Sequence, residues 1–92
     1  MAVEVRIPTI LRTYTGGDKS VQGQGATLAE LFDDVEGRHP GLKARIVDET
    51  TLRRFVNVYV NDEDVRFSGG LSSPVADGDV VVVLPAVAGG SN

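Results

Sequence analysis

Two consecutive glycines near the C-terminal end are the residues whose type and spacing point most directly to chemistry. The sequence runs from an apolar segment, residues 80–84, through Pro85 and a stretch of small residues to Gly89 and Gly90. Because glycine has no Cβ, such a pair can enter a slot that is too narrow for other residues. An enzyme with such a slot could take in the carboxylate that follows the glycines, activate it with ATP and exclude other chain ends. Pro85 stiffens the start of this segment, and three small residues can thread behind the glycines: Ala86, Val87 and Ala88.

Elsewhere the side chains indicate no catalytic residue and no metal site. The 92 residues include no cysteine, which excludes disulfides, thiolate catalysis and cysteine-based zinc sites. The one histidine, His39, precedes a proline, and we interpret it as a residue at a helix end rather than a ligand or base. Asp62, Glu63 and Asp64 could bind a cation, but a solvated turn is the favoured interpretation. We therefore expect a protein that is not an enzyme and that binds no cofactor of its own.

Composition and charge narrow the class of protein further. The formal net charge is −4, and the nine Lys and Arg residues are spread along the sequence, which argues against nucleic-acid binding. No segment is long and apolar enough to span a membrane, and the N-terminus lacks the pattern of a signal peptide, so we expect a cytoplasmic location. The length predicts one domain, residues 1–85, followed by a flexible tail, residues 86–92.

Alternation and helical periodicity predict the first half of the domain. Val3, Val5 and Ile7 alternate with polar residues, which predicts a strand, and a glycine-containing turn at 13–18 leads to a second strand at 19–22. An apolar stripe then predicts a helix of about three turns. We expect Thr27 to cap its N-terminus and Glu30 to reach back to the N–H of Thr27. Arg38 and His39 are predicted to form a basic last turn. The stripe comprises Leu28, Leu31, Phe32 and Val35.

The second half predicts the rest of a mixed sheet. Residues 42–47 predict a short helical turn, 48–53 a loop and 55–60 a strand that directs Val56, Val58 and Val60 to the core. Residues 65–67 predict a short return strand. The uninterrupted apolar run at 80–84 predicts a central strand beside the first one. The fold class is therefore α+β, a β-grasp (ubiquitin-like) fold with a mixed sheet of four to five strands and one main helix across one face.

Three segments of the sequence resemble the ThiS/MoaD family of sulfur carrier proteins. They are IPTILR near the start, RFVNVYVNDEDVRFSGGL in the middle and LPAVAGG at the end, and together with the order of elements the resemblance covers essentially the whole chain. Within the family these segments are most similar to the branch that serves cysteine synthesis.

The resemblance implies a specific chemistry for the glycine pair. An E1-like adenylating enzyme of the MoeB/ThiF type uses ATP to adenylate the terminal glycine, and sulfur then replaces one oxygen to give a thiocarboxylate. A sulfur-accepting synthase, such as cysteine synthase, uses that sulfur, and a JAMM-type zinc peptidase releases the product. Carried over to this sequence, Gly90 bears the thiocarboxylate and Gly89 is the slender residue behind it.

The sequence departs from the family pattern after Gly90, because Ser91 and Asn92 follow it. We expect both residues to be removed by a peptidase before activation, the other interpretation being a cloning scar. Two other functions stay open: a ubiquitin-like modifier conjugated through Gly90, and a β-grasp interaction module that is not conjugated.

An adenylating enzyme would have to bind the face of the sheet near the tail. Phe55 and Tyr59 are predicted to point away from the core, and exposed aromatic residues on a sheet mark contact surfaces. Arg54 and Arg66 could add charge steering. The alternative interpretation is that the two aromatic residues pack beneath a loop.

Overall fold

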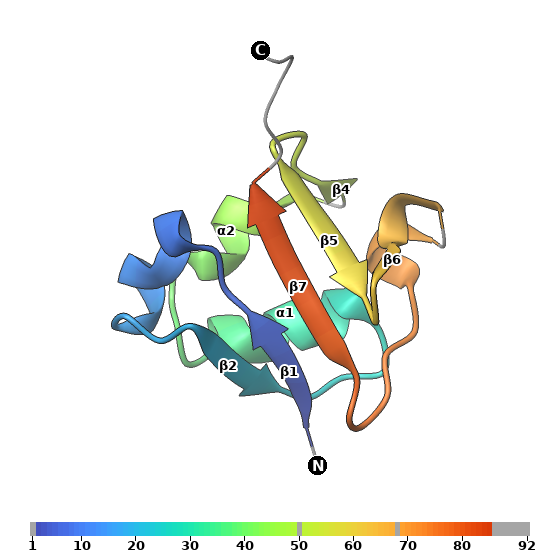
Figure 1. The fold of residues 1–92 in the computed structure, drawn as a ribbon, viewed down its shortest axis with the longest axis horizontal. Coiled ribbons are helices and arrows are strands. Elements are labelled where there is room, and N and C mark those ends of the chain that lie inside the picture. Colours follow the sequence, from blue (N-terminus) through green and yellow to red (C-terminus); the bar gives the residue numbers. More distant parts are fainter. Residues whose placement is uncertain (1, 50, 68, 86–92) are drawn as a thin grey trace.

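The computed structural model describes residues 2–49, 51–67 and 69–85, and a five-stranded mixed sheet forms the centre of this part (Figure 1). The sheet order is β2-β1-β7-β5-β6. Strand β7 is parallel to β1 and antiparallel to β5, so it lies in the middle of the sheet beside the first strand, as its apolar run predicted. The strands are β1 (Val3–Arg6), β2 (Ser20–Gly23), β5 (Val56–Val60), β6 (Glu63–Asp64) and β7 (Val80–Pro85).

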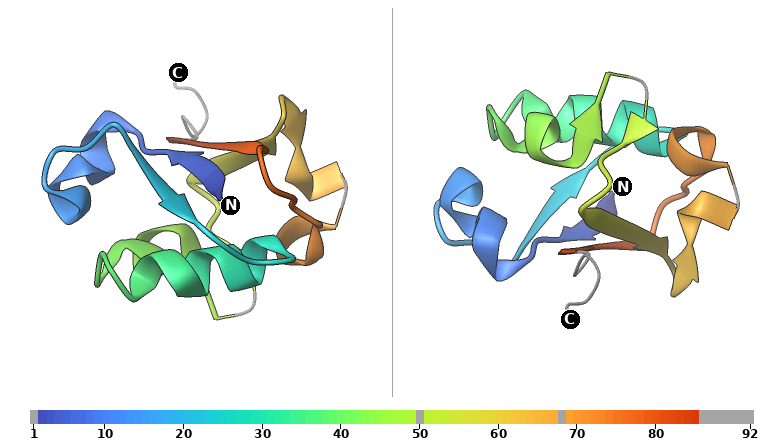
Figure 2. Two further views of the ribbon diagram at one scale, coloured as in Figure 1. Left: turned by 90° about the horizontal axis from the view of Figure 1, so that it is seen from below. Right: turned by 90° about the horizontal axis from the view of Figure 1, so that it is seen from above.

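The helices α1 (Leu28–Glu36) and α2 (Leu42–Ile46) lie on the same side of this sheet (Figure 2). The predicted apolar stripe of α1 is fully buried, with no member more than 2% exposed. The side chains that meet it from the sheet are buried as deeply: Val5, Val58, Val81 and Val83. A sheet and a helix, each with one apolar face, thus bury these faces against each other. This arrangement confirms the predicted β-grasp fold.

The N-terminus of α1 is capped almost as predicted, with one difference. The Thr27 side chain accepts a hydrogen bond from the Glu30 N–H at 3.3 Å. The Glu30 carboxylate, however, accepts from the N–H of Ala26 at 2.9 Å, whereas the sequence predicted the N–H of Thr27. The extended backbone of Thr27 brings the preceding N–H within reach of that carboxylate. At the other end the helix stops at Glu36, so the predicted basic last turn is wrong and Arg38 and His39 follow the helix.

The connections contain elements that the sequence did not reveal. Between β1 and β2 the chain forms η1 (Thr9–Thr15), a 3₁₀ helix that overlaps the first half of the turn predicted at 13–18. Gly16 and Gly17, both with positive φ, form the turn itself. The predicted loop at 48–53 contains a small hairpin, β3 (Val47–Asp48) with β4 (Thr51–Leu52). Another short 3₁₀ helix, η3 (Gly70–Ser72), precedes β7. The two strands of the hairpin and η3 have only two or three residues each, which is too short to show a hydrophobic period.

The predicted return strand at 65–67 is wrong in position. Asn61 and Asp62 both have positive φ, 50° and 74°, and form a two-residue turn, which Asn and Asp tolerate better than most residues. The chain therefore reverses early, Val60 pairs with Glu63, and β6 is complete by Asp64. Val65 to Phe67 then form the 3₁₀ helix η2, in which Val65 is fully buried.

Gly25 allows the segment after β2 to pass directly against α1. A Cβ atom at this position would lie 2.6 Å from the backbone nitrogen of Leu31 and 2.9 Å from the Cβ of Glu30. Separations below about 3 Å require the backbone to move, so no larger residue is accommodated without a shift of the helix. Gly25 therefore has a packing role in this fold.

Candidate functional site

The site is built around the end of β7, from which the glycine-containing segment continues. Val56 pairs with Pro85 and Asn57 with Leu84, and the pairing of β5 with β7 runs from Val81 to Pro85, the end of the strand. The side chains of Val81 and Val83 are buried, whereas Leu84 and Pro85 are exposed. The predicted tail, residues 86–92, lies outside the described residues and includes both glycines of the candidate site. The structure thus describes the base of the tail and the surface around it.

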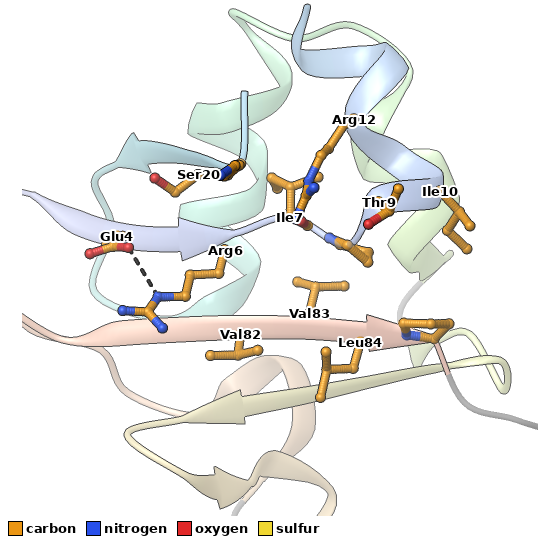
Figure 3. A pocket seen from close by; sticks show the side chains of 13 residues that line it. Glu4, Arg6, Ile7, Thr9, Ile10, Arg12, Ser20, Val82, Val83 and Leu84 are labelled. Carbon is orange, nitrogen blue, oxygen red and sulfur yellow. Dashed lines mark hydrogen bonds and ion pairs between the residues drawn. The ribbon is translucent and has the colours of Figure 1, made fainter. Parts of the chain in front are cut away.

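A first hollow, of about 550 Å³, lies beside Pro85 between β1, β7 and η1 (Figure 3). Figure 3 shows the side chains of Val82 and Leu84 on one side of β7 and that of Val83 on the other, as expected for a strand with one buried face. Arg6 lies in the same hollow and its guanidinium pairs with Glu4 at 3.1 Å. Both partners of this ion pair are exposed, so it contributes little to stability.

A second hollow, of about 390 Å³, also borders Pro85 and lies between η1, α2 and the turn before β5. Ile10 from η1 and Phe55 from that turn supply apolar surface, and Arg45 and Arg53 supply positive charge. Ile10, Phe55 and Leu84 are the large hydrophobic side chains that are exposed among the described residues, by 66%, 60% and 44%. Each of them lines a hollow that also contains Pro85. Exposed apolar groups gathered at one place mark a contact surface.

Arg66 holds the turn that presents Phe55. Its guanidinium donates to the Val56 carbonyl at 2.6 Å and to Oδ1 of Asn57 at 2.9 Å, and two longer contacts of 3.4 Å reach the carbonyls of Arg53 and Arg54. The Asp64 carboxylate in turn accepts from the Arg66 N–H at 2.9 Å. One side chain from η2 therefore fixes the whole segment between β4 and β5.

The predicted partner-binding residues do not all lie at the same place. Phe55, predicted as the first residue of the strand at 55–60, instead lies in the turn before β5, where it lines the second hollow. Arg54 is exposed in the same turn and Arg66 braces it. Tyr59 is half-buried on β5 opposite Val82, and it lines neither of the two hollows.

Sequence reasoning missed Ile10, Arg45 and Arg53. These residues come from three separate segments that only the tertiary fold brings together at Pro85. One signal was available for Ile10: it is apolar, yet it lies outside the alternation of the first strand.

Hydrogen bonds to Glu36 fix the position of α2 beside the second hollow. The Glu36 carboxylate accepts from the N–H groups of Gly41 and Lys43, each at 2.9 Å. These two backbone donors hold the pKa of Glu36 below its ordinary value, because they favour the ionised form. The carboxylate thus caps the start of α2, the helix that carries Arg45 to the second hollow.

Two further findings concern the described part of the chain. His, Asp and Glu side chains do not come together there in any group of three or more that could hold a metal ion; Asp62, one of the acidic residues considered above, belongs to the two-residue turn after β5. None of its helices is long and apolar enough to cross a membrane.

Comparison with protein families gives a match over nearly the whole sequence. The model of the ThiS family matches residues 5–90, which include both Gly89 and Gly90. The chain belongs to the ThiS family. The predicted resemblance is thereby confirmed.

Proteins similar to this chain include carriers and a modifier. Sulfur carrier protein CysO of Mycobacterium tuberculosis is 57% identical over 98% of this chain and 100% of its own length. A chain in the crystal structure of the Amycolatopsis orientalis BexX/CysO complex is 68% identical, with a TM-score of 0.91 over 97% of this chain and 100% of that one. Small archaeal modifier protein 3 of Haloferax volcanii is 31% identical over 98% of this chain and 100% of its own length.

Proposed function

We propose that this member of the ThiS family is a sulfur carrier, a protein substrate that carries sulfur on the C-terminal carbonyl of Gly90. The observation that carries the proposal is the position of the glycine pair. The family match extends through Gly89 and Gly90, and these residues follow the central strand β7 after a short spacer. The similarity to CysO, which is a sulfur carrier protein by name, supports the same conclusion.

The proposed chemistry takes place in two steps on the Gly90 carboxylate. In the first, one carboxylate oxygen attacks the α-phosphorus of ATP on an E1-like (MoeB/ThiF-type) enzyme, which gives an acyl-adenylate and releases pyrophosphate. In the second, hydrosulfide attacks the acyl carbon and AMP leaves, so that a thiocarboxylate remains after loss of the proton on sulfur. The chain supplies no catalytic group and binds no cofactor; ATP belongs to the activating enzyme. Because this enzyme consumes ATP, we propose that the exchange takes place in the cytoplasm.

The thiocarboxylate then serves as the nucleophile for an acceptor enzyme. We propose cysteine synthase or another biosynthetic synthase as this acceptor, followed by release of the product by a JAMM-type zinc peptidase. The complex between BexX and a protein 68% identical to this chain supports direct docking on a partner protein.

Ser91 and Asn92 must be removed before activation, because the carboxylate of Gly90 is otherwise part of a peptide bond. We propose that a peptidase cleaves after Gly90, and the zinc peptidase of the same pathway is a candidate. Residues 1–85 then form the folded carrier, and residues 86–90 form the segment that enters the enzyme, with Ala86, Val87 and Ala88 threading behind the glycines.

The residues at the base of the tail would be those that the enzymes recognise. The exposed ring of Phe55 beside Pro85 supports a contact there. We propose Arg54, Arg66 and Tyr59 as further members of the contact surface, Arg66 through its hold on the turn that presents Phe55.

Intact-mass measurement tests the proposal directly. The full-length chain and a form that ends at Gly90 are each incubated with ATP, sulfide and the adenylating enzyme of the same cell. We expect the form that ends at Gly90 to gain the mass difference between sulfur and oxygen, and the full-length chain to remain unchanged. A matched form that lacks Gly89 and Gly90 serves as the control. If none of the forms changes although the adenylating enzyme is demonstrably active, the proposal is refuted.

A second function is favoured by one specific comparison. The 31% identity to small archaeal modifier protein 3 raises conjugation of Gly90 to lysine side chains as an alternative. Both functions use the same activated carboxylate. Isopeptide-linked adducts of this chain in cell extracts would support the modifier function, and free thiocarboxylate without adducts would support the carrier.

A further inference from the structure

Positive charge is concentrated around Pro85, at the base of the tail, although the chain as a whole is acidic. Five of the nine Lys and Arg residues line the two hollows beside Pro85. Of the thirteen Asp and Glu residues, Glu4 alone lines them. The single acid is already paired with Arg6. The surface around Pro85 is therefore cationic, although the net charge of the protein is −4.

An enzyme that takes in Gly90 has to touch this surface. The segment from Ala86 to Gly90 has five residues and can span at most on the order of 17 Å, even when fully extended. If the active site lies at the end of a slot, much of this length lies inside the slot. The rim of the slot must then press against the groups around Pro85, which include the exposed side chains of Ile10 and Phe55.

The second hollow combines the two kinds of group that a specific contact needs. Ile10 and Phe55 are both more than half exposed, and Arg45 and Arg53 lie in the same lining. Arg53 is held against α2 by a hydrogen bond from its Nε to the Ala44 carbonyl at 2.6 Å. Neither arginine forms an ion pair with a carboxylate of the described residues.

The geometry of α2 separates Arg45 from the other cation on that helix. Lys43 is paired with Asp33 of α1 and lines a different hollow, on the side of Leu71 and Ser72. Arg45, two residues later, lines the second hollow beside Pro85. The helix therefore uses one cation to contact α1 and leaves the other available beside Pro85.

We propose that the second hollow is the docking site for an acidic segment of the adenylating enzyme. An apolar side chain of that segment enters between Ile10 and Phe55, and carboxylates beside it pair with Arg45 and Arg53. The exposed apolar groups and the overall negative charge favour a protein partner over a nucleic acid. The inference rests on the proposed carrier function, because it assumes that an enzyme takes in the tail.

Steady-state kinetics of adenylation test this docking site. The form that ends at Gly90 is assayed by ATP–pyrophosphate exchange with the adenylating enzyme of the same cell. The variant Arg45→Gln/Arg53→Gln removes the two cations of the hollow. Its control, Arg38→Gln/Lys43→Gln, removes the same charge from two cations that pair with Asp34 and Asp33 of α1. Melting temperatures establish that both variants fold.

We expect the hollow variant to raise the KM for the carrier about five-fold at low ionic strength with kcat unchanged, and the control to change KM less than about two-fold. The difference should shrink as NaCl rises to about 0.5 M, because salt screens charges at a protein rim. Ile10→Ser should also raise KM, and this increase should persist at high salt.

Three outcomes separate the inference from the function on which it rests. No exchange with the unaltered carrier contradicts the carrier function itself. Normal exchange with equal KM for the hollow variant and its control overturns the docking site. A KM that rises only for the hollow variant, and less so in salt, supports it.

Discussion

Replacement of Arg66 by alanine tests whether one side chain holds the turn that presents Phe55. In the structure the guanidinium donates to the Val56 carbonyl and to Asn57, and it approaches the carbonyls of Arg53 and Arg54. Arg66→Ala removes all four contacts. It leaves the Asp64 carboxylate bonded to the backbone N–H of residue 66.

The expected loss follows from the two short hydrogen bonds, at 2.6 Å and 2.9 Å. A hydrogen bond from a charged donor contributes about 1.5–3 kcal/mol, but Arg66 is exposed and water can replace it in part, so we expect a total near 2 kcal/mol. For a domain of this size, each kcal/mol lowers the melting temperature by about 4–8 °C. Arg66→Ala should therefore melt roughly 8–16 °C below the unaltered protein.

Calorimetry of three variants separates geometry from charge. Arg66→Lys keeps the charge but cannot reproduce the planar fork of the guanidinium, so it should lose about half as much stability. Arg54→Ala, in the same turn, removes an exposed side chain and should melt within about 3 °C of the unaltered protein. An Arg66→Ala protein that melts within about 2 °C of the unaltered one would show that this side chain does not hold the turn.

Three further changes test other parts of the structure. Phe55→Asp should weaken binding to the adenylating enzyme in a calorimetric titration while stability changes by less than about 0.5 kcal/mol, because the ring is 60% exposed; a sharply lower melting temperature would instead place Phe55 in the core. Gly25→Ala should cost about 1–3 kcal/mol in urea unfolding, because its Cβ would meet the backbone of α1; an unchanged midpoint contradicts this close approach. The folded-state pKa of Glu36 is lowered, so its stabilisation is present above the ordinary value of 4.5 and is lost as the pH falls through the folded pKa. Glu36→Gln should therefore flatten the acid side of a urea-midpoint profile, and an unchanged profile argues against this effect.

The elements that sequence analysis predicted best are those with a long, regular period. The stripe of α1 and the apolar run of β7 each satisfy one simple geometric pattern, and both lie where that pattern predicts. The position of β6 was missed because it depends on the backbone conformation of Asn61 and Asp62. The 3₁₀ helix η1 was missed because its buried residues follow no simple period along the sequence. Leu11 and Thr15 are buried, while Ile10 is exposed.

The candidate site was predicted only as far as one continuous segment of sequence could indicate it. The glycine pair and Phe55 are recognisable from residue type. Arg45 and Arg53 look like ordinary surface cations in the sequence, and their meeting beside Pro85 depends on how α2 packs against the turn before β5. Arg66 shows the reverse case, because its charge suggested steering whereas its hydrogen bonds show that it braces the turn.

The parallel pairing of β1 with β7 has a consequence for the synthesis of the protein. Val5 pairs with Val81, so the centre of the sheet joins residues from nearly opposite ends of the sequence. On the ribosome β1, β2 and α1 emerge first, and their apolar faces have no complete partner until β7 follows. Such non-local pairing slows folding and leaves apolar surface open to aggregation in the meantime. Because β7 directly precedes the tail, the sheet cannot be completed until synthesis has passed Gly89 and Gly90 and β7 has left the ribosome.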